Sequence, residues 1–244
     1  MNNIHIPPVV KNLLIINILF FAATYVFQSK GIELAQYLGA FYFDSVYFKV
    51  WQPISYMFMH GGFTHILFNM FALYMFGSIL ESRWGAKRFI NFYLITGLGA
   101  LALQWAVQAF EVYHITGTAI NQSPGLLEHL EKGQFNPAQF TEIQAATLHG
   151  IYFSPMVGAS GAIFGLLVAF GMLYPNTELY IMFIPVPVKA KYIIPIYIVV
   201  ELFLGVASFQ GDSVAHYAHL GGALLGFILV KLWKDKNTFY DYYD

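Results

Sequence analysis

Long apolar stretches, separated by short polar segments, recur along the whole chain. Six of them have the length and composition of membrane-spanning helices, and they cover residues 11–28, 64–82, 88–110, 160–174, 192–209 and 214–232. No internal repeat or low-complexity tract divides this pattern. We therefore predict an all-α, polytopic membrane protein with six transmembrane helices, forming a single membrane domain over residues 1–244.

The composition agrees with this prediction. Hydrophobic residues make up 58% of the chain and aromatic residues 18%, whereas charged residues make up only 10%, which is far more apolar than a typical soluble domain. The net charge of -1 argues against nucleic acid as a partner, so the lipid bilayer is the expected surrounding. The chain has no cysteine, which excludes disulfide bonds, thiolate metal sites and a thiol nucleophile.

The distribution of lysine and arginine predicts the orientation in the membrane. If the chain crosses six times, most of these residues fall on one side, and they are Lys11, Arg83, Lys87, Arg88, Lys189, Lys191, Lys231, Lys234 and Lys236. The other side holds Lys30, Lys49 and Lys132. Because positive residues are enriched in cytoplasmic loops, both termini are expected in the cytoplasm. The second, fourth and sixth spans then begin at the outer face.

Two long connections are expected on the outer side. Residues 29–62 are rich in aromatic side chains, which favours an interfacial loop at the level of the lipid headgroups. Residues 111–157 form the most polar part of the chain, and we interpret them as an extramembrane insertion. Its segments SPGLLEHLEKG and NPAQFTEIQAATLHG each contain a capping residue, then a proline, then a terminal glycine, which predicts two short helices.

The fourth stretch is too short to cross a whole bilayer. From Ser160 to Tyr174 a helix would rise about 22 Å, against a hydrocarbon core of about 30 Å. The helix should therefore start inside the membrane, and the backbone at Gly158 and Ala159 before it requires a polar cavity. A helix start also stabilises an anion, which makes Ser160 a candidate for a catalytic position and Gly158 a candidate for the oxyanion-binding region. The alternative is that Ser160 only caps its helix.

Glycine spacing predicts that the fourth and sixth helices approach closely. In the sixth stretch His219 lies on the same helix face as Gly222 and Gly226, three and seven residues later. The fourth stretch carries its own pair, Gly161 and Gly165. Helices that meet through small residues would bring the histidine within hydrogen-bonding reach of the serine that starts the fourth helix. Such a pair is a nucleophile beside a base.

The second stretch supplies further polar groups near the outer face. His65 and Asn69 are four residues apart and share a helix face, so both could donate hydrogen bonds to an oxyanion. His60 precedes this helix, and it either takes part in the site or only braces the loop. In the fifth stretch, Glu201 should lie near the middle or the cytoplasmic half of the membrane. We expect it to make a structural hydrogen bond, with a catalytic role as the alternative.

Four motifs, in a fixed order, carry a resemblance to a known family, and they read HGGFTHILFN, ESRWG, GASGAIFG and AHLGGALLG. Together they resemble the rhomboid family of intramembrane serine proteases over nearly the whole six-span core. The resemblance implies that Ser160 is the nucleophile and His219 the general base of a Ser-His dyad. It also implies an oxyanion hole formed by His65, Asn69 and the backbone N–H of Ser160.

Two positions depart from the common family pattern. Phe164, four residues after the serine, stands where some members have tyrosine, and its ring could stack on His219 without supplying a hydroxyl. Trp51-Gln52 stands where the loop after the first span often carries Trp-Arg. The connection 111–157 is also longer than a minimal family core requires.

The resemblance implies an endopeptidase that needs no metal or cofactor. It would hydrolyse transmembrane proteins near the outer membrane boundary, and substrates would enter sideways at the fifth helix and the loop after it. Stretches of small, helix-destabilising residues would be preferred, because a helix must unwind before a carbonyl can meet the serine. A bacterial inner membrane is the expected location.

Two alternatives remain open. Histidines could converge on a metal ion in an enzyme or transporter, and the candidates are His60, His65, His216 and His219. Against this, no carboxylate or cysteine is expected to accompany them. The second alternative is a non-catalytic relative that only binds membrane helices, although such a protein need not retain both the serine and the histidine.

Overall fold

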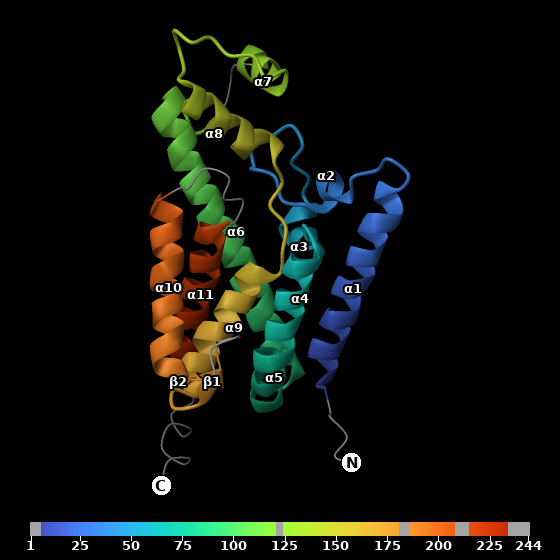
Figure 1. Cartoon of the computed structure of the whole chain (residues 1–244), viewed down its shortest axis with the longest axis vertical. Helices are drawn as coiled ribbons and strands as arrows, with labels where there is room; N and C mark the ends of the chain where they lie inside the picture. Colours follow the sequence, from blue (N-terminus) through green and yellow to red (C-terminus); the bar gives the residue numbers. More distant parts are fainter. Residues whose placement is uncertain (1–5, 121–123, 181–185, 208–214, 234–244) are drawn as a thin grey trace.

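The described part of the protein is mainly helical, and most of its long helices run side by side (Figure 1). The computed structural model describes residues 6–120, 124–180, 186–207 and 215–233. Within these ranges, four helices are long and apolar enough to cross a membrane, and they are α1 (Pro8–Gln28), the continuous run Phe63–Trp84, α6 (Ala86–Thr116) and α10 (Ala190–Ala207). Two shorter apolar helices are α9 (Ser160–Leu173) and α11 (His216–Leu232). The predicted all-α class is confirmed.

Shorter elements complete the described fold. The run Phe63–Trp84 consists of α4 (Phe63–Ala72), a π-helical turn η2 (Leu73–Gly77) and α5 (Ser78–Trp84). The two long connections hold α2 (Leu34–Leu38), α3 (Gln52–Ser55), the 3-10 turn η1 (Tyr56–Phe58), α7 (Pro124–Glu131) and α8 (Glu142–Phe153). After α9, the strands β1 (Glu178–Tyr180) and β2 (Pro187–Lys189) pair antiparallel, a hairpin that the hydrophobic pattern does not predict.

Several helices differ in length from the apolar stretches that predict them. The first helix begins at Pro8 rather than at residue 11, because a proline without an N–H group is tolerated in the first turn. The third continues beyond residue 110 to Thr116, and the C-cap residue Gly117 that follows has a φ of 80°. Val112 in these added turns is fully buried, so protein packing stabilises them. The predicted limits at 208–209 and 214 lie outside the described residues.

The two ends of the helix bundle differ in their connections. Figure 1 shows the start of α1, α5 and the β1–β2 hairpin at one end, and α2, α7 and α8 at the other. Lys11 in α1, Arg83 in α5 and Lys189 in β2 therefore belong to the same end, whereas Lys132 directly follows α7 at the opposite end. This separation agrees with the orientation that the basic residues predict.

The connection 111–157 folds onto the end of α6. Its apolar side chains form a buried cluster with Tyr42 of the first connection. The first predicted helix is present as α7, but the second begins at Glu142, five residues later than the proline of NPAQF suggests. Thr141 and Gln144 explain this start, because each side chain bonds the other's backbone N–H in a capping box.

The aromatic residues of the connection 29–62 divide into two groups. Phe41, Tyr42 and Tyr56 are almost completely buried inside the protein. Tyr37 and Trp51 are instead more than half exposed. The high aromatic content of this segment therefore serves the protein core as well as the outer surface.

Gln52 anchors the connection between α1 and α4, and it is one of the two positions that depart from the family pattern noted above. The side chain is fully buried, and its carbonyl oxygen accepts hydrogen bonds from the backbone N–H groups of Phe41 and Lys49 at 3.3 and 3.1 Å. Its amide nitrogen donates to the backbone oxygen of Tyr47 at 3.0 Å. The uncharged amide thus satisfies three backbone groups of the loop.

The glutamate of the ESRWG motif joins two helices that are distant in the sequence. Its carboxylate oxygens accept hydrogen bonds from the backbone N–H groups of Val9 and Val10 at 2.9 and 2.7 Å. These N–H groups lie in the first turn of α1 and have no partner within their own helix. Glu81 of α5 therefore caps α1 and favours its position beside α5.

Glycines bring α9, α11 and α6 together. A Cβ on Gly222 would lie 2.7 Å from the carbonyl carbon of Gly161, closer than side chains tolerate. One turn later, a Cβ on Gly226 would lie 2.7 Å from the Cα of Gly165. Gly165 also faces α6, where its Cβ would lie 2.6 Å from Thr96. Only residues without a side chain allow this approach, which fixes the distance between α9 and α11.

Candidate active site

Ser160 is the first residue of α9, a helix that starts part-way along its neighbours. After α8 the chain runs down the bundle before α9 begins (Figure 1). Gly158 has a φ of 133°, which residues with a side chain rarely adopt, and a Cβ there would lie 2.9 Å from the ring of His65. The N–H of Gly158 donates to the carbonyl oxygen of Tyr56 at 3.0 Å. This turn holds Ser160 beside α4.

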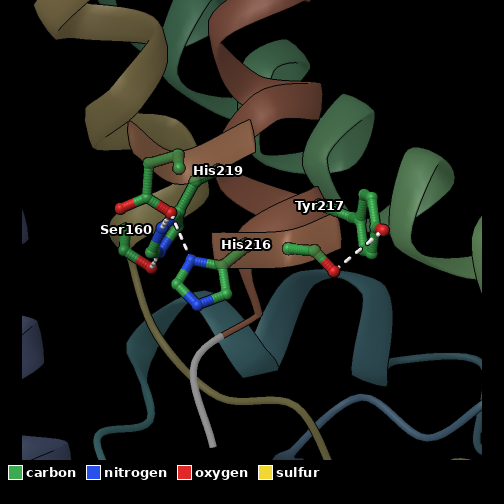
Figure 2. Close-up of polar contacts among 6 residues, drawn as sticks. Ser160, His216, Tyr217 and His219 are labelled. Carbon is green, nitrogen blue, oxygen red and sulfur yellow. Dashed lines mark hydrogen bonds and ion pairs between the residues drawn. The ribbon is translucent and has the colours of Figure 1, made fainter. Parts of the chain in front are cut away.

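The Ser160 hydroxyl faces the ring of His219. The distance from Oγ to the His219 Nε2 atom is 2.8 Å, and Figure 2 shows the two side chains pointing toward one another. The serine is half-buried, and the histidine in the first turn of α11 is 8% exposed. Ala159 is the N-cap residue of α9, and no side chain makes a capping hydrogen bond there. The serine therefore has no capping role in this structure.

An aromatic ring covers one face of the histidine. The rings of Phe164 and His219 stack with centroids 4.3 Å apart and an angle of 8° between their planes. Tyr197 of α10 packs on Phe164 at a centroid distance of 5.0 Å. Phe164 lies one turn after Ser160, so the same helix supplies the hydroxyl and the ring that orients its partner.

A carboxylate also meets this histidine, contrary to the expectation from the sequence. The Glu201 Oε2 atom lies 2.9 Å from Nδ1 of His219 and 2.7 Å from Nδ1 of His216. Glu201 is 4% exposed. The expectation that no carboxylate accompanies the histidines is therefore wrong. Glu201 faces α11 because it belongs to the buried side of α10, together with Ile194 and Gly205.

His65 and Asn69 lie on α4, the helix beside the turn that precedes Ser160. The N–H of Gly61 donates to Nδ1 of His65 at 3.3 Å, which leaves the proton of a neutral ring on Nε2. That Nε2 atom is the one beside Gly158. Asn69 is buried, and its Nδ2 has no hydrogen-bond partner within the described part of the chain. Both groups are available as donors.

His60 packs against His65 rather than joining the other histidines. Their ring centroids are 5.0 Å apart, with an angle of 66° between the planes. Burial lowers the pKa of His60 to about 4, so the ring is neutral at pH 7. Among the described residues, the cluster that could hold a metal ion consists of Glu201, His216 and His219, whose ligand atoms lie within 4.8 Å of one another. The four histidines considered from the sequence do not converge on one point.

Sequence comparisons identify relatives of this chain. The family model of the Rhomboid domain matches residues 47–234. An uncharacterized mitochondrial rhomboid protein of Schizosaccharomyces pombe is 26% identical over 210 residues, which are 78% of this chain and 53% of the relative. The chloroplastic rhomboid-like protein 11 of Arabidopsis thaliana is 27% identical over 90% of this chain and 63% of its own length. The mitochondrial rhomboid protein 1 of Saccharomyces cerevisiae is 27% identical over 69% of this chain and 38% of its own.

The relatives restrict what can be transferred to this chain. Matches to these three proteins span between 38% and 63% of the relatives' lengths. Their names refer to mitochondria and a chloroplast, so they give no support to the expected bacterial inner membrane. The matches and the apolar helices together support a multi-pass membrane protein.

Proposed function

This chain belongs to the rhomboid family, and we propose that it is an intramembrane serine endopeptidase that cleaves transmembrane proteins near the outer membrane boundary. The observation that carries the proposal is the contact of 2.8 Å between Ser160 Oγ and His219 Nε2. A serine hydroxyl is a weak nucleophile, and a base at hydrogen-bonding distance is the arrangement that activates it. Retention of both residues argues against a relative that only binds membrane helices.

The proposed reaction proceeds through an acyl-enzyme. Ser160 Oγ attacks the scissile carbonyl carbon while its proton passes to Nε2 of His219. The C–N bond then breaks, and the imidazolium returns this proton to the leaving nitrogen. A water molecule next gives a proton to His219 and attacks the ester, and Ser160 takes the proton back as the acid product leaves. The side chains end as they began.

Three donors are proposed for the oxyanion. The N–H of Ser160 belongs to the first turn of α9 and has no carbonyl partner within that helix. His65 presents its Nε2–H beside Gly158, and Asn69 contributes its buried Nδ2. Glycine at 158 leaves room for the substrate carbonyl next to these groups. Donors placed before the reaction stabilise the charge that develops in the transition state.

We propose that α9 and α11 are the fourth and sixth of six crossings in one membrane domain. The 14 residues of α9 rise about 21 Å, short of a hydrocarbon core of about 30 Å. Ser160 would then lie below the outer surface, at the bottom of a polar opening. The basic residues at the ends of α1, α5 and β2 support cytoplasmic termini.

Substrates are proposed to enter from the lipid at α10. Few residues of α10 are buried, and most of the helix is exposed at the edge of the bundle (Figure 1). A transmembrane segment must expose its backbone to reach Ser160, so segments rich in small, helix-destabilising residues are the expected substrates.

A metal-dependent hydrolase is the second candidate function, because Glu201, His216 and His219 could together ligate a cation. Such a cation would bind His219 through Nδ1 and leave the proton of the neutral ring on Nε2. His219 could then no longer accept the serine proton. The two functions therefore exclude each other at this ring, and the contact between Nε2 and the hydroxyl favours serine chemistry.

Covalent labelling tests the proposed function. A fluorophosphonate should bond to Ser160 in the purified protein, and Ser160→Ala should abolish the label, because only an activated serine reacts with this reagent. Cleavage of a single-span substrate should continue in the presence of EDTA. Cleavage that stops with EDTA and persists in Ser160→Ala would show metal chemistry instead.

Asn69→Ala should lower turnover without abolishing it. Loss of one oxyanion donor typically reduces kcat by about 10²–10³, so residual cleavage should be measurable in a long gel-based assay. Asn17→Ala is the matched control, because Asn17 is also buried but donates to Leu13 within its own helix. Unchanged turnover in Asn69→Ala, with an altered melting temperature, would assign this residue to packing alone.

A further inference from the structure

We propose that Glu201 on α10 is a positioning residue for His219, so that the site operates as a Ser-His-Glu triad rather than a dyad. This inference rests on the proposed function. It assigns to a residue outside the family-like motifs the task of fixing which ring nitrogen of His219 faces the serine.

The hydrogen bonds define the ring state. With Glu201 ionised, its carboxylate only accepts hydrogen bonds, and the proton of a neutral His219 ring then lies on Nδ1, 2.9 Å from Glu201 Oε2. The opposite nitrogen, Nε2, then carries a lone pair and faces the Ser160 hydroxyl at 2.8 Å. Only this tautomer can accept the serine proton. Without the carboxylate, the other tautomer would also be populated, with Nε2–H pointing at the nucleophile.

The second histidine keeps the carboxylate in place. Nδ1 of His216 donates to the same Oε2 atom at 2.7 Å, and His216 is itself 7% exposed. The Tyr217 hydroxyl donates at 3.0 Å to the carbonyl oxygen of Gly205, which lies one turn after Glu201 on α10 (Figure 2). Two neighbouring residues of α11 therefore each hold α10. Glu201 cannot rotate away from His219 without losing its bond to His216.

The charge of Glu201 adds to its orienting effect. When His219 takes the serine proton, the ring becomes a cation between the nucleophile and the carboxylate. Both side chains are nearly inaccessible to water, where an opposite charge is screened little. The titratable groups around the pair are His216 on α11, Tyr197 on α10 and His65 on α4. Of these three and Glu201, only Glu201 can carry a negative charge near pH 7.

Glu201→Gln tests this role, because the amide keeps the shape of the side chain but not its charge. We expect kcat for a single-span substrate to fall by about 10²–10⁴, with KM nearly unchanged. The weaker stabilisation of the imidazolium raises the barrier of the chemical step, so the loss should appear in kcat. Glu201→Asp should recover part of the lost turnover, because it restores the charge.

Tyr217→Phe is the matched control, since it removes a side-chain hydrogen bond from α11 to Gly205 of α10 and leaves both bonds of the Glu201 carboxylate in place. Its turnover should stay within about threefold of the wild type, because this bond involves neither Ser160, His219 nor Glu201. A purely structural Glu201 would lower the melting temperature but leave kcat unchanged, which would overturn the inference. Cleavage by the wild type that requires added Zn²⁺ would overturn it as well.

The same measurements separate this inference from the proposed function. If the wild type cleaves, depends on Ser160, and loses nothing in Glu201→Gln, the triad is wrong and the serine protease stands. If the wild type neither cleaves nor reacts with a fluorophosphonate, the proposed function itself fails, and the triad with it.

Discussion

His219→Ala should abolish proteolysis while the protein remains folded. The alanine leaves the Ser160 hydroxyl without the base that lies 2.8 Å away, and no other described ring nitrogen lies at hydrogen-bonding distance from that hydroxyl. Removing the base of a serine hydrolase costs about 10⁴–10⁶ in kcat, which places the variant below detection. The measurement is cleavage of a single-span substrate in liposomes, followed on gels beside the wild type and Ser160→Ala.

His149→Ala provides the matched control, because it is the same substitution on the exposed side of α8. Its cleavage rate should equal that of the wild type. Ser160→Ala, His219→Ala and His149→Ala should all remain folded, since the glycine contacts between α9 and α11 are unchanged. Cleavage by His219→Ala at more than a few per cent of the wild-type rate would contradict a catalytic base at this position.

The sequence predicts the elements that depend on local patterns. The apolar stretches give the helices, and the glycine before the serine gives the start of α9, because both rest on residues close together in the chain. The start of α8 is different, since Asn136-Pro137 and Thr141 are competing signals. The capping box at Thr141 satisfies two N–H groups at once and determines the helix start.

The position of Glu201 could not be predicted from the family-like motifs, because the contact crosses between helices. The place of Glu201 in its apolar stretch predicts a depth near the middle or the cytoplasmic half of the membrane. The helix face on which Glu201 lies, however, determines which side chains it contacts. Ala190, Ile194, Glu201 and Gly205 share the buried side of α10 at spacings of four, seven and four residues. This periodicity, read together with the single carboxylate, is the signal that would have directed Glu201 toward α11.

The loop between α1 and α4 shows the opposite case, in which a changed residue keeps its task. A glutamine replaces the charged residue common in the family, and from the sequence its anchoring role could not be derived. The structure shows why the exchange is tolerated: Gln52 is buried where an amide can both accept and donate. Hydrogen-bond capacity, rather than charge, is what the loop requires.

The distance between α9 and α11 controls the whole site, because the nucleophile and the base lie on different helices. Ser160 is one residue before Gly161, and His219 is one turn before Gly222. The backbone contact between these two glycines therefore lies within one helical turn of both residues of the hydrogen-bonded pair. A side chain at this contact would push α9 and α11 apart and so lengthen the distance between the nucleophile and the base.

Gly222→Val should eliminate cleavage and destabilise the protein. The new Cβ would lie 2.7 Å from the carbonyl carbon of Gly161 and nearer still to its oxygen, and rigid backbone cannot move aside as a side chain would. Overpacking of this kind typically costs about 1–3 kcal/mol, and separation of the helices by about 1 Å is enough to lose a catalytic hydrogen bond.

Gly150→Val in α8 is the matched control, because nothing lies within 4 Å of its Cβ. Cleavage and melting temperature measured for both variants decide the point, and wild-type activity in Gly222→Val would mean that the glycine contact does not set the distance between serine and histidine.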